Sequence, residues 1–191
     1  RNDMQSQLKE LQKRLHKTIM FITHDLDEAL RLGDHIAILK DGELRQVGTA
    51  EEILLNPADD YVRRFVTDVN RGRVVKAKTV AEKIPTVTVS KLNIETVREA
   101  LSQTKMRGIF VLADDGKIVG GANRRLLEMC GDVINVDELL PVETVSEDTV
   151  IDEAFHQSAN IELPLAVLEP SGVLLGALSR QGLMSAIARE L

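Results

Sequence analysis

One histidine stands where a side chain could reach a ligand. His24 and Asp25 follow an apolar run, Thr18–Thr23, and precede Leu26–Leu32, a segment with acidic residues at its start. Open α/β sheets present side chains to ligands at the carboxyl end of a short buried strand, just before a helix. His24 is therefore the first candidate functional residue. A strand-end histidine that only hydrogen-bonds to a nearby loop is the alternative interpretation.

The surrounding pattern predicts the elements that would position this histidine. Thr18–Thr23 is short, β-branched and without alternation, which indicates a strand buried on both faces of a parallel sheet. Asp25 is expected to cap a helix over Leu26–Leu32, and Gly33 to end it. Upstream, Asn2–His16 carries apolar residues at helical spacing and is predicted to be an amphipathic helix.

Two strands and two further helices are predicted next. Asp41-Gly42 is one of the strongest short hairpin signals, because such a turn needs positive φ. Thr49 stands three residues before Glu52, which is the spacing of a capping box. The predicted elements are strands over His35–Leu39 and Glu43–Val47, a helix from Thr49 through Leu55, and an amphipathic helix over Asp60–Val69.

The order of these motifs is specific. The stretch TIMFITHDLDEALRLGDHIAILKDGELRQVGTAEEILLNP resembles the carboxyl-terminal end of an ABC transporter ATPase, and the match covers about the first 66 residues. The resemblance aligns His24 with the switch histidine that contacts the γ-phosphate of ATP. A neutral imidazole can exchange one hydrogen bond with that phosphate or with the attacking water.

Other parts of an ATPase are missing from the sequence. It contains no G-x-x-x-x-G-K-[ST] phosphate loop, no LSGGQ-like stretch, and no apolar run that ends in Asp-Glu. The resemblance implies ATP and Mg²⁺ as cofactors of an intact protein, whereas this chain alone is expected to be inactive. An independent enzyme that uses His24 as a general base is a weaker alternative. The abrupt start inside a helical pattern, without Met, predicts a fragment of a longer protein.

Charge and composition limit the partners. The net charge is −6 and only 3% of residues are aromatic, with no Trp, so nucleic acid is not an expected partner. Positive charge is concentrated in residues 61–80, with six basic side chains and one acidic. The sequence RGRVVKAK at 71–78 is predicted to be a basic linker, either a solvated spacer or a strip that faces the phosphates of a nucleotide or of anionic lipids. The single cysteine, Cys130, excludes an internal disulfide.

The rest of the chain contains a repeat of about 55 residues. KIPTVTVS at 83–90 matches LLPVETVS at 139–146, VREAL at 97–101 matches IDEAF at 151–155, and IFVLADDGKIVGGA at 109–122 matches LAVLEPSGVLLGAL at 165–178. Each copy is predicted to run strand, helix, strand, tight turn, strand, helix. Units this small are marginal alone, so the two copies are expected to pack together.

This repeat resembles tandem CBS domains, a paired βαββα module that binds adenosine compounds in the clefts between its copies. The resemblance suggests that Asn123 and Arg124 in copy one, and Ser179 and Arg180 in copy two, receive a phosphate at a helix start. Exposed helix-start residues without a ligand are the alternative. In many nucleotide-binding members the last strand ends in G-x-x-[ST]-x-x-D, and the Asp of this motif binds the ribose. The residues at the position of that Asp are Leu126 in copy one and Gly182 in copy two. The resemblance therefore supplies no ribose contact.

The expected fold class is α/β, a carboxyl-terminal fragment of an ABC ATPase domain followed by a tandem CBS module. The expected boundaries are 1–70 for the ATPase remnant, 71–78 for the linker, and 79–133 and 134–191 for the two CBS copies. This combination resembles the ATP-binding subunit of osmoprotectant importers for glycine betaine, proline or choline.

The resemblance implies a peripheral homodimer at the cytoplasmic face of the inner membrane. Its partners would be a transmembrane permease and a substrate-binding protein. The CBS pair would sense ionic strength or bind AMP, ATP or cyclic di-AMP. The alternative is a stand-alone nucleotide-sensing CBS dimer unrelated to osmoprotectant transport. Ile19–Ile22 and Ile36–Leu39 are also expected to lack neighbouring strands, and so to pair with another chain or become disordered.

Overall fold

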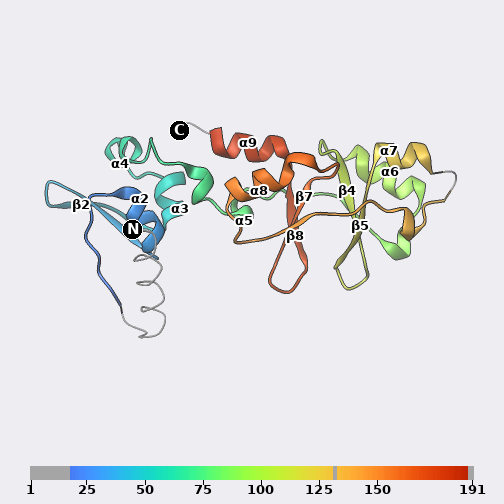
Figure 1. Cartoon of the computed structure of the whole chain (residues 1–191), viewed down its shortest axis with the longest axis horizontal. Coiled ribbons are helices and arrows are strands. Elements are labelled where there is room, and N and C mark those ends of the chain that lie inside the picture. The colour runs from blue at the N-terminus through green and yellow to red at the C-terminus, as the bar shows by residue number, and fades with distance from the viewer. Residues whose placement is uncertain (1–17, 131–132, 189–191) are drawn as a thin grey trace. The chain divides into compact units, whose positions relative to one another are not determined.

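The computed structural model describes residues 18–130 and 133–188. The chain divides between Val74 and Val75 into two compact units, here called unit 1 and unit 2 (Figure 1). The helix predicted over Asn2–His16 lies outside the described residues. None of the described helices combines the length and apolar character needed to cross a lipid bilayer.

Over residues 18–74, unit 1 consists of a hairpin, three short helices and one 3₁₀ turn. Its elements are α2 (Leu26–Leu32), β1 (Ile36–Lys40), β2 (Glu43–Gly48), α3 (Ala50–Leu55), α4 (Asp60–Phe65) and η1 (Arg71–Arg73). Seven buried apolar residues form its core: Leu30, Ile36, Ile38, Ile53, Leu54, Val62 and Val66.

Local signals in the sequence account for most of these elements. Asp25 caps α2 by accepting a hydrogen bond from the Glu28 amide at 3.1 Å, as predicted. The capping box is confirmed, because Thr49 and Glu52 each accept a hydrogen bond from the other's amide. The hairpin turn is confirmed too, with positive φ at Asp41 and at the following glycine. The helix predicted over Asp60–Val69 is shorter than expected and ends at Phe65.

The prediction of a buried strand over Thr18–Thr23 is wrong. This segment has no regular structure, and its side chains Met20 and Ile22 are 90% and 89% exposed. A strand needs a neighbour to satisfy its backbone hydrogen bonds. In the described part of unit 1, β1 and β2 pair only with each other, so no strand lies beside Thr18–Thr23. Residues Ile36–Leu39 do have a partner strand and are ordered in β1.

Unit 2 contains both copies of the repeat. Copy one consists of β3 (Thr86–Thr88), α6 (Ile94–Ser102), β4 (Gly108–Leu112), β5 (Ile118–Asn123) and α7 (Arg124–Met129), with the 3₁₀ turn η2 (Val89–Lys91). Copy two consists of β6 (Thr144–Ser146), α8 (Ile151–Gln157), β7 (Leu165–Leu168), β8 (Leu174–Leu178) and α9 (Arg180–Ala188), with η3 (Val136–Glu138) before it and η4 (Ser158–Asn160) within it. The short helix α5 (Ala77–Val80) precedes copy one.

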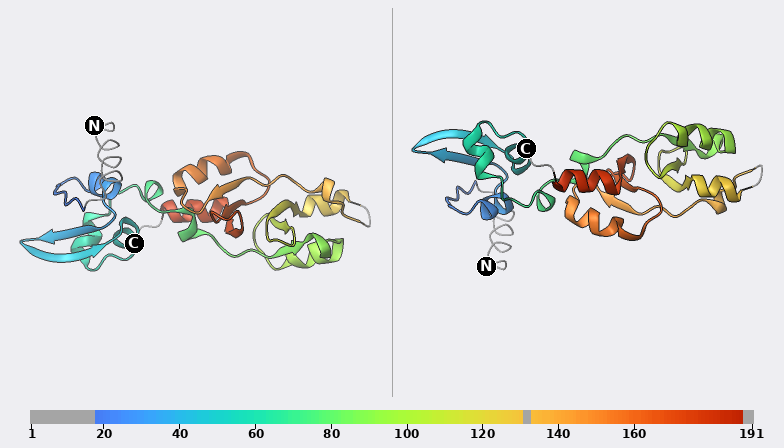
Figure 2. Two further views of the ribbon diagram at one scale, coloured as in Figure 1. Left: turned by 90° about the horizontal axis from the view of Figure 1, so that it is seen from below. Right: turned by 90° about the horizontal axis from the view of Figure 1, so that it is seen from above.

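The two copies share one topology, which confirms the predicted βαββα repeat. In each copy the first strand pairs in parallel with the second, and the second pairs antiparallel with the third. The two helices of a copy lie beside each other, α6 with α7 and α8 with α9 (Figures 1 and 2). Gly116 and Gly172 supply the positive φ of the tight turns between the second and third strands.

The structure aligns the first strands of the two copies, β3 and β6, differently from the sequence repeat. The sequence match aligns Val87 with Glu143. In the sheets, however, Val87 lies opposite Val111, and Val145 lies opposite Val167. Val87 and Val145 are the buried residues of their strands, at 6% and 5% exposure. Burial of one valine per strand therefore sets the register, and it shifts the match by two residues.

Each copy is joined to the last strand of the other. The backbone of Glu82, ahead of copy one, exchanges two hydrogen bonds of 2.9 Å with Ala177 in β8. Leu140, ahead of copy two, exchanges two hydrogen bonds of the same length with Gly121 in β5. The segments around Glu82 and Leu140, just before β3 and β6, are here called the lead-in segments. Because each pairs with the last strand of the other copy, they hold the copies together in one compact unit.

Part of the predicted linker is ordered within unit 2. The Ala77 amide donates to the Thr149 carbonyl at 2.7 Å, and the Ile151 amide donates to the Val75 carbonyl at 3.0 Å. Val75 and Ala77 are 1% and 0% exposed. Apolar residues that alternate with the lysines therefore anchor this segment against copy two.

Candidate functional site

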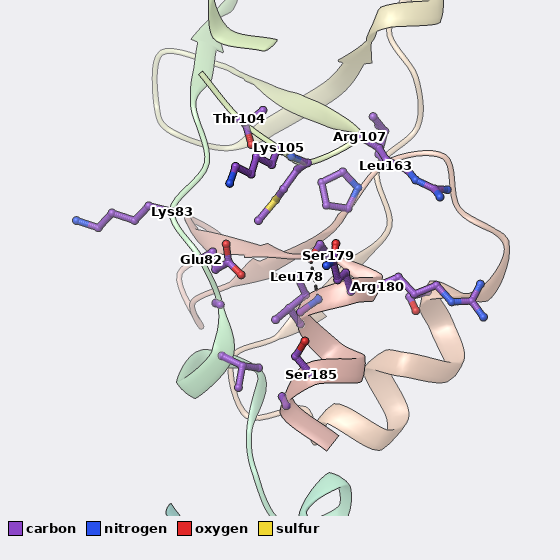
Figure 3. A pocket seen from close by; sticks show the side chains of 18 of the residues that line it. Glu82, Lys83, Thr104, Lys105, Arg107, Leu163, Leu178, Ser179, Arg180 and Ser185 are labelled. Atoms are coloured by element: carbon purple, nitrogen blue, oxygen red, sulfur yellow. Dashed lines mark hydrogen bonds between the residues drawn. The ribbon is translucent and has the colours of Figure 1, made fainter. Parts of the chain in front are cut away.

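A hollow of unit 2 lies between the two copies of the repeat (Figure 3). It encloses about 900 Å³, within the range of small-molecule sites. Its walls come from four parts of the chain, within residues 79–85, 103–107, 158–164 and 178–186. Because both copies contribute, a ligand in this cavity would contact both.

The wall at the end of β8 is held rigidly. Ser179 follows β8 and its hydroxyl accepts a hydrogen bond from the Gly182 amide at 2.9 Å, which caps the start of α9. The lead-in segment is held beside this end of β8 by the paired hydrogen bonds between Glu82 and Ala177. In this wall, the Gly182 amide and the backbone of Glu82 therefore already have hydrogen-bond partners.

The cavity lining carries more positive than negative charge. Four basic residues and one acidic residue lie along it: Lys83, Lys105, Arg107, Arg180 and Glu82. Figure 3 shows Lys83 extended away from the cavity and Arg180 turned to the far side of α9. The excess of positive charge favours an anionic ligand.

Arg180 is held in this turned position by other residues of copy two. Its Nη1 donates to the Ala159 carbonyl at 3.3 Å, and its guanidinium lies 5.5 Å from the centre of the Phe155 ring. A guanidinium over an aromatic face is a favourable cation–π arrangement. Arg180 would have to leave these contacts to meet a phosphate in the cavity, whereas Lys105 makes no such contact with another described residue.

The four phosphate contacts suggested by the sequence divide into two pairs. Ser179 and Arg180 both line the cavity. Asn123 and Arg124 do not. Asn123 is 8% exposed and caps α7 by accepting from the Leu126 amide at 2.9 Å, and Arg124 is exposed. The structure therefore brings only the copy-two pair to the cavity.

At the equivalent place in copy one, two leucines stand where Ala81 and Glu82 stand beside the cavity. These are Leu139 and Leu140, as the two pairs of exchanged hydrogen bonds show. A Cβ added at Gly120 would lie 2.6 Å from the Leu139 Cβ, so that side chain is pressed against the β5 backbone. Leu139 also packs against the core of copy one. The two clefts of the pair are therefore chemically different.

Leu163 explains why two further positions are glycine. A Cβ at Gly121 would lie 2.4 Å from the Leu163 Cδ1, and one at Gly108 would lie 2.3 Å from its Cδ2. Leu163 is 5% exposed and borders the cavity. Its side chain thus fills the space over the copy-one sheet up to the edge of the cavity.

Sequence reasoning did not single out Glu82, Lys105 or Arg107. A position-by-position comparison of the repeats could have found the two basic residues, but it aligns Glu82 with Glu138 and so could not have found Glu82. Copy two has Ile161 and Leu163 where copy one has Lys105 and Arg107. Charged residues in only one copy of a repeat mark a difference that the shared fold does not require.

His24 lies in unit 1, in a bend before α2, and is exposed. The predicted strand before it is absent, so it does not stand at a strand end. Thr23 stabilises this bend, because its hydroxyl donates to Glu28 at 2.8 Å and accepts from the Asp25 amide at 3.0 Å. The loop around the histidine is therefore ordered by its neighbours.

Comparison with known proteins identifies relatives of the whole chain, although no family model matches it. The glycine betaine transport ATP-binding protein OpuAA of Bacillus subtilis (strain 168) is 36% identical over 98% of this chain and 46% of its own length. The glycine betaine/proline betaine transport system ATP-binding protein ProV of Escherichia coli (strain K12) is 35% identical over 100% of this chain and 49% of its own length. The chain thus spans about half the length of these curated relatives.

Solved structures resemble the paired repeat. A CBS domain pair/ACT domain protein from Thermotoga maritima has a TM-score of 0.52 and 23% identity, and the match covers 59% of this chain and 95% of that one. CBSX2 in complex with AMP has a TM-score of 0.50 and 20% identity, with 58% and 94% covered. At these identities the likeness concerns the fold. Over nearly its whole length the chain is a homologue of the ATP-binding subunits of glycine betaine and proline betaine ABC transporters, and its repeat has the fold of a CBS domain pair.

Proposed function

We propose that this chain is the regulatory portion of the ATPase subunit of an ABC importer for osmoprotectants of the glycine betaine, proline or choline type. The observation that carries the proposal is homology to transport ATP-binding proteins over 98% of the chain, and so over both units. In this assignment residues 1–70 belong to the ATPase domain, 71–78 form the connection, and 79–133 and 134–191 are the CBS copies. A CBS sensor unrelated to osmoprotectant transport is disfavoured, because the homology includes unit 1.

An importer of this kind implies further partners. A permease would carry the solute through the membrane, and a substrate-binding protein would deliver it. The ATPase subunit would act as a peripheral homodimer at the cytoplasmic face. Anionic lipid head groups are a candidate partner for the basic segment 71–78, because polybasic segments bind such surfaces.

In the intact subunit, His24 would contact the γ-phosphate of ATP. An exposed imidazole at an ordered bend can offer one hydrogen bond to a phosphate oxygen or to a water molecule. Within residues 18–130 and 133–188, no group of three or more His, Cys, Asp or Glu side chains comes together. The metal and the phosphate cradle would therefore come from residues other than those described here.

The regulatory ligand of the CBS pair would be an adenine nucleotide bound in the cavity. The predominantly basic lining and the volume of about 900 Å³ support such a ligand. A similar pair, CBSX2, has been solved in complex with AMP. AMP, ATP and cyclic di-AMP are the candidates. Because the walls come from both copies, a bound ligand would stabilise the arrangement of the two copies in which it fits. A shift toward that arrangement would in turn change the activity of the ATPase domain.

Ionic strength is a second candidate signal, and one cluster of charges favours it. Lys76 and Lys78 both pair with Asp148, with Nζ to Oδ1 distances of 2.9 and 3.1 Å, and all three side chains are at least 40% exposed. Exposed pairs weaken as the Debye length falls from about 10 Å at 0.1 M salt to about 3 Å at 1 M. Salt would thus loosen the segment that leads into the CBS pair.

Calorimetry on the whole chain tests the nucleotide proposal. AMP, ATP and cyclic di-AMP are titrated separately at 0.1 M salt, and we expect saturable binding of at least one. Arg107→Gln should weaken that binding, whereas Lys117→Gln, at the β4–β5 turn away from the cavity, should leave it unchanged. If none of the three nucleotides binds at millimolar concentration, the nucleotide proposal is wrong.

A further inference from the structure

The Glu82 backbone occupies a fixed place in the cavity wall. It is paired with Ala177 by hydrogen bonds in both directions. Figure 3 shows the Glu82 carboxylate on the side of its segment that faces Ser179, whereas the neighbouring Lys83 extends to the opposite side. The place from which the Glu82 side chain extends is therefore set by sheet pairing rather than by a flexible loop.

The carboxylate lies beside the first turn of α9. Its Oε1 is 3.4 Å from the place where a Cβ at Gly182 would stand, and Gly182 is hydrogen-bonded to Ser179. This distance is an ordinary van der Waals contact, so the Glu82 carboxylate lies directly beside residue 182, although the two residues are far apart in the sequence.

Within the described part of the chain, the Glu82 carboxylate makes no hydrogen bond or ion pair, although Lys105 and Arg107 line the same cavity. An ionised carboxylate only accepts hydrogen bonds. A ligand group that contacts the Glu82 carboxylate must therefore donate a hydrogen bond, as a hydroxyl or an amine does. A phosphate at this point would be repelled by the negative charge of the carboxylate. At the equivalent position, copy one has Leu140, which shows that the fold itself does not need a carboxylate there.

We infer that Glu82 recognises the ribose hydroxyls of the nucleotide and so selects ribonucleotides over deoxyribonucleotides. This inference rests on the proposed nucleotide site. The anionic phosphate would be met by the basic residues of the lining, and the hydroxyls would donate to Glu82. Recognition by a group built to accept hydrogen bonds discriminates strongly against an analogue that lacks the donor.

Calorimetry with AMP and 2′,3′-dideoxy-AMP on the whole chain tests this role. The wild-type chain should bind AMP at least about tenfold more tightly, since hydrogen bonds to a charged group are among the stronger ones. In Glu82→Gln the neutral amide should bring the ratio of the two affinities close to one. The same substitution at Glu143, an exposed residue in the equivalent lead-in segment of copy two, should leave the ratio as in the wild type.

The outcomes separate the inference from the proposal beneath it. If AMP binds and Glu82→Gln keeps the wild-type ratio, the inference is overturned while the nucleotide site stands. If AMP does not bind but ATP does, the same comparison is made with ATP and 2′,3′-dideoxy-ATP. If the wild-type chain binds none of AMP, ATP and cyclic di-AMP, both are overturned. Circular dichroism checks that Glu82→Gln keeps the secondary structure of the wild-type chain.

Discussion

Asp148 and Lys76 form an ion pair of 2.9 Å that joins the segment entering unit 2 to the turn after β6. Lys78 reaches the same Oδ1 atom, so one carboxylate receives two ammonium groups. The backbone beside this cluster is also paired, because the Lys78 amide donates to the Glu147 carbonyl at 3.0 Å. Charge and backbone pairing thus act together to hold residues 75–78 against copy two.

The first prediction concerns pH. Hydrogen bonds from Lys76 and Lys78 lower the pKa of Asp148. A carboxyl group with a lowered pKa stabilises the fold above its unfolded pKa of about 3.9, and this contribution is lost as pH falls through the lower folded value. Hydrogen exchange of the Ala77 and Lys78 amides should therefore be faster in Asp148→Asn than in the wild type at pH 7. The difference should disappear below the folded pKa.

Two comparisons support or contradict that result. Asp137→Asn removes an exposed carboxylate in η3 and should not change exchange at Ala77. Raising the salt concentration to 1 M should reduce the difference between wild type and Asp148→Asn at pH 7. Equal exchange rates in both proteins at neutral pH and low salt would contradict the role given to Asp148.

The second prediction concerns the number of ligands. Since Leu139 and Leu140 replace Ala81 and Glu82 at the equivalent place in copy one, we expect one nucleotide to bind per chain. Ala81→Leu, which places in the cavity wall the residue found at 139, should weaken binding at least about tenfold by occupying space. Calorimetry measures both quantities. A stoichiometry of two per chain would show that the equivalent place in copy one also binds a nucleotide.

The third prediction concerns unit 1. Thr49→Ala removes the hydroxyl that accepts from the Glu52 amide at 3.2 Å, and helix caps of this kind contribute about 1 kcal/mol. The free energy of opening measured by hydrogen exchange in α3 should fall by about that amount. Thr18→Ala, in the irregular exposed segment, serves as a control and should change it by no more than a few tenths of a kcal/mol.

The fourth prediction concerns a close backbone approach. Gly120→Ala would place a Cβ 2.6 Å from the Leu139 Cβ, so the lead-in segment of copy two would have to shift. Such overpacking costs about 1–3 kcal/mol, measured as the free energy of unfolding in urea. Gly182→Ala is the milder comparison, since its nearest atom is 3.1 Å away and belongs to a side chain. Equal stability of Gly120→Ala and the wild type would contradict the packing of Leu139 on β5.

Local signals in the sequence were sufficient for much of the fold. Asp25, Thr49 and Asp41 act on backbone groups within a few residues of themselves, so their caps and turn could be predicted and were confirmed. The repeat was equally visible, because each copy encodes the same order of elements. The prediction of a strand over Thr18–Thr23 was wrong, because a strand forms only beside another strand, and the composition of the segment does not show whether one is there.

In the candidate site, too, some features follow from the local sequence and others only from the tertiary structure. The sequence by itself determined that Ser179 would stand at the start of a helix, because a strand, a hydroxyl residue and a helical pattern follow one another there. Only the tertiary structure decided which of the two helix starts faces an open cavity. It did so by placing Ala81 and Glu82 beside one last strand and Leu139 and Leu140 beside the other. The physical reason is that pairing between distant segments of the chain, rather than local propensity, brings Glu82 next to Gly182.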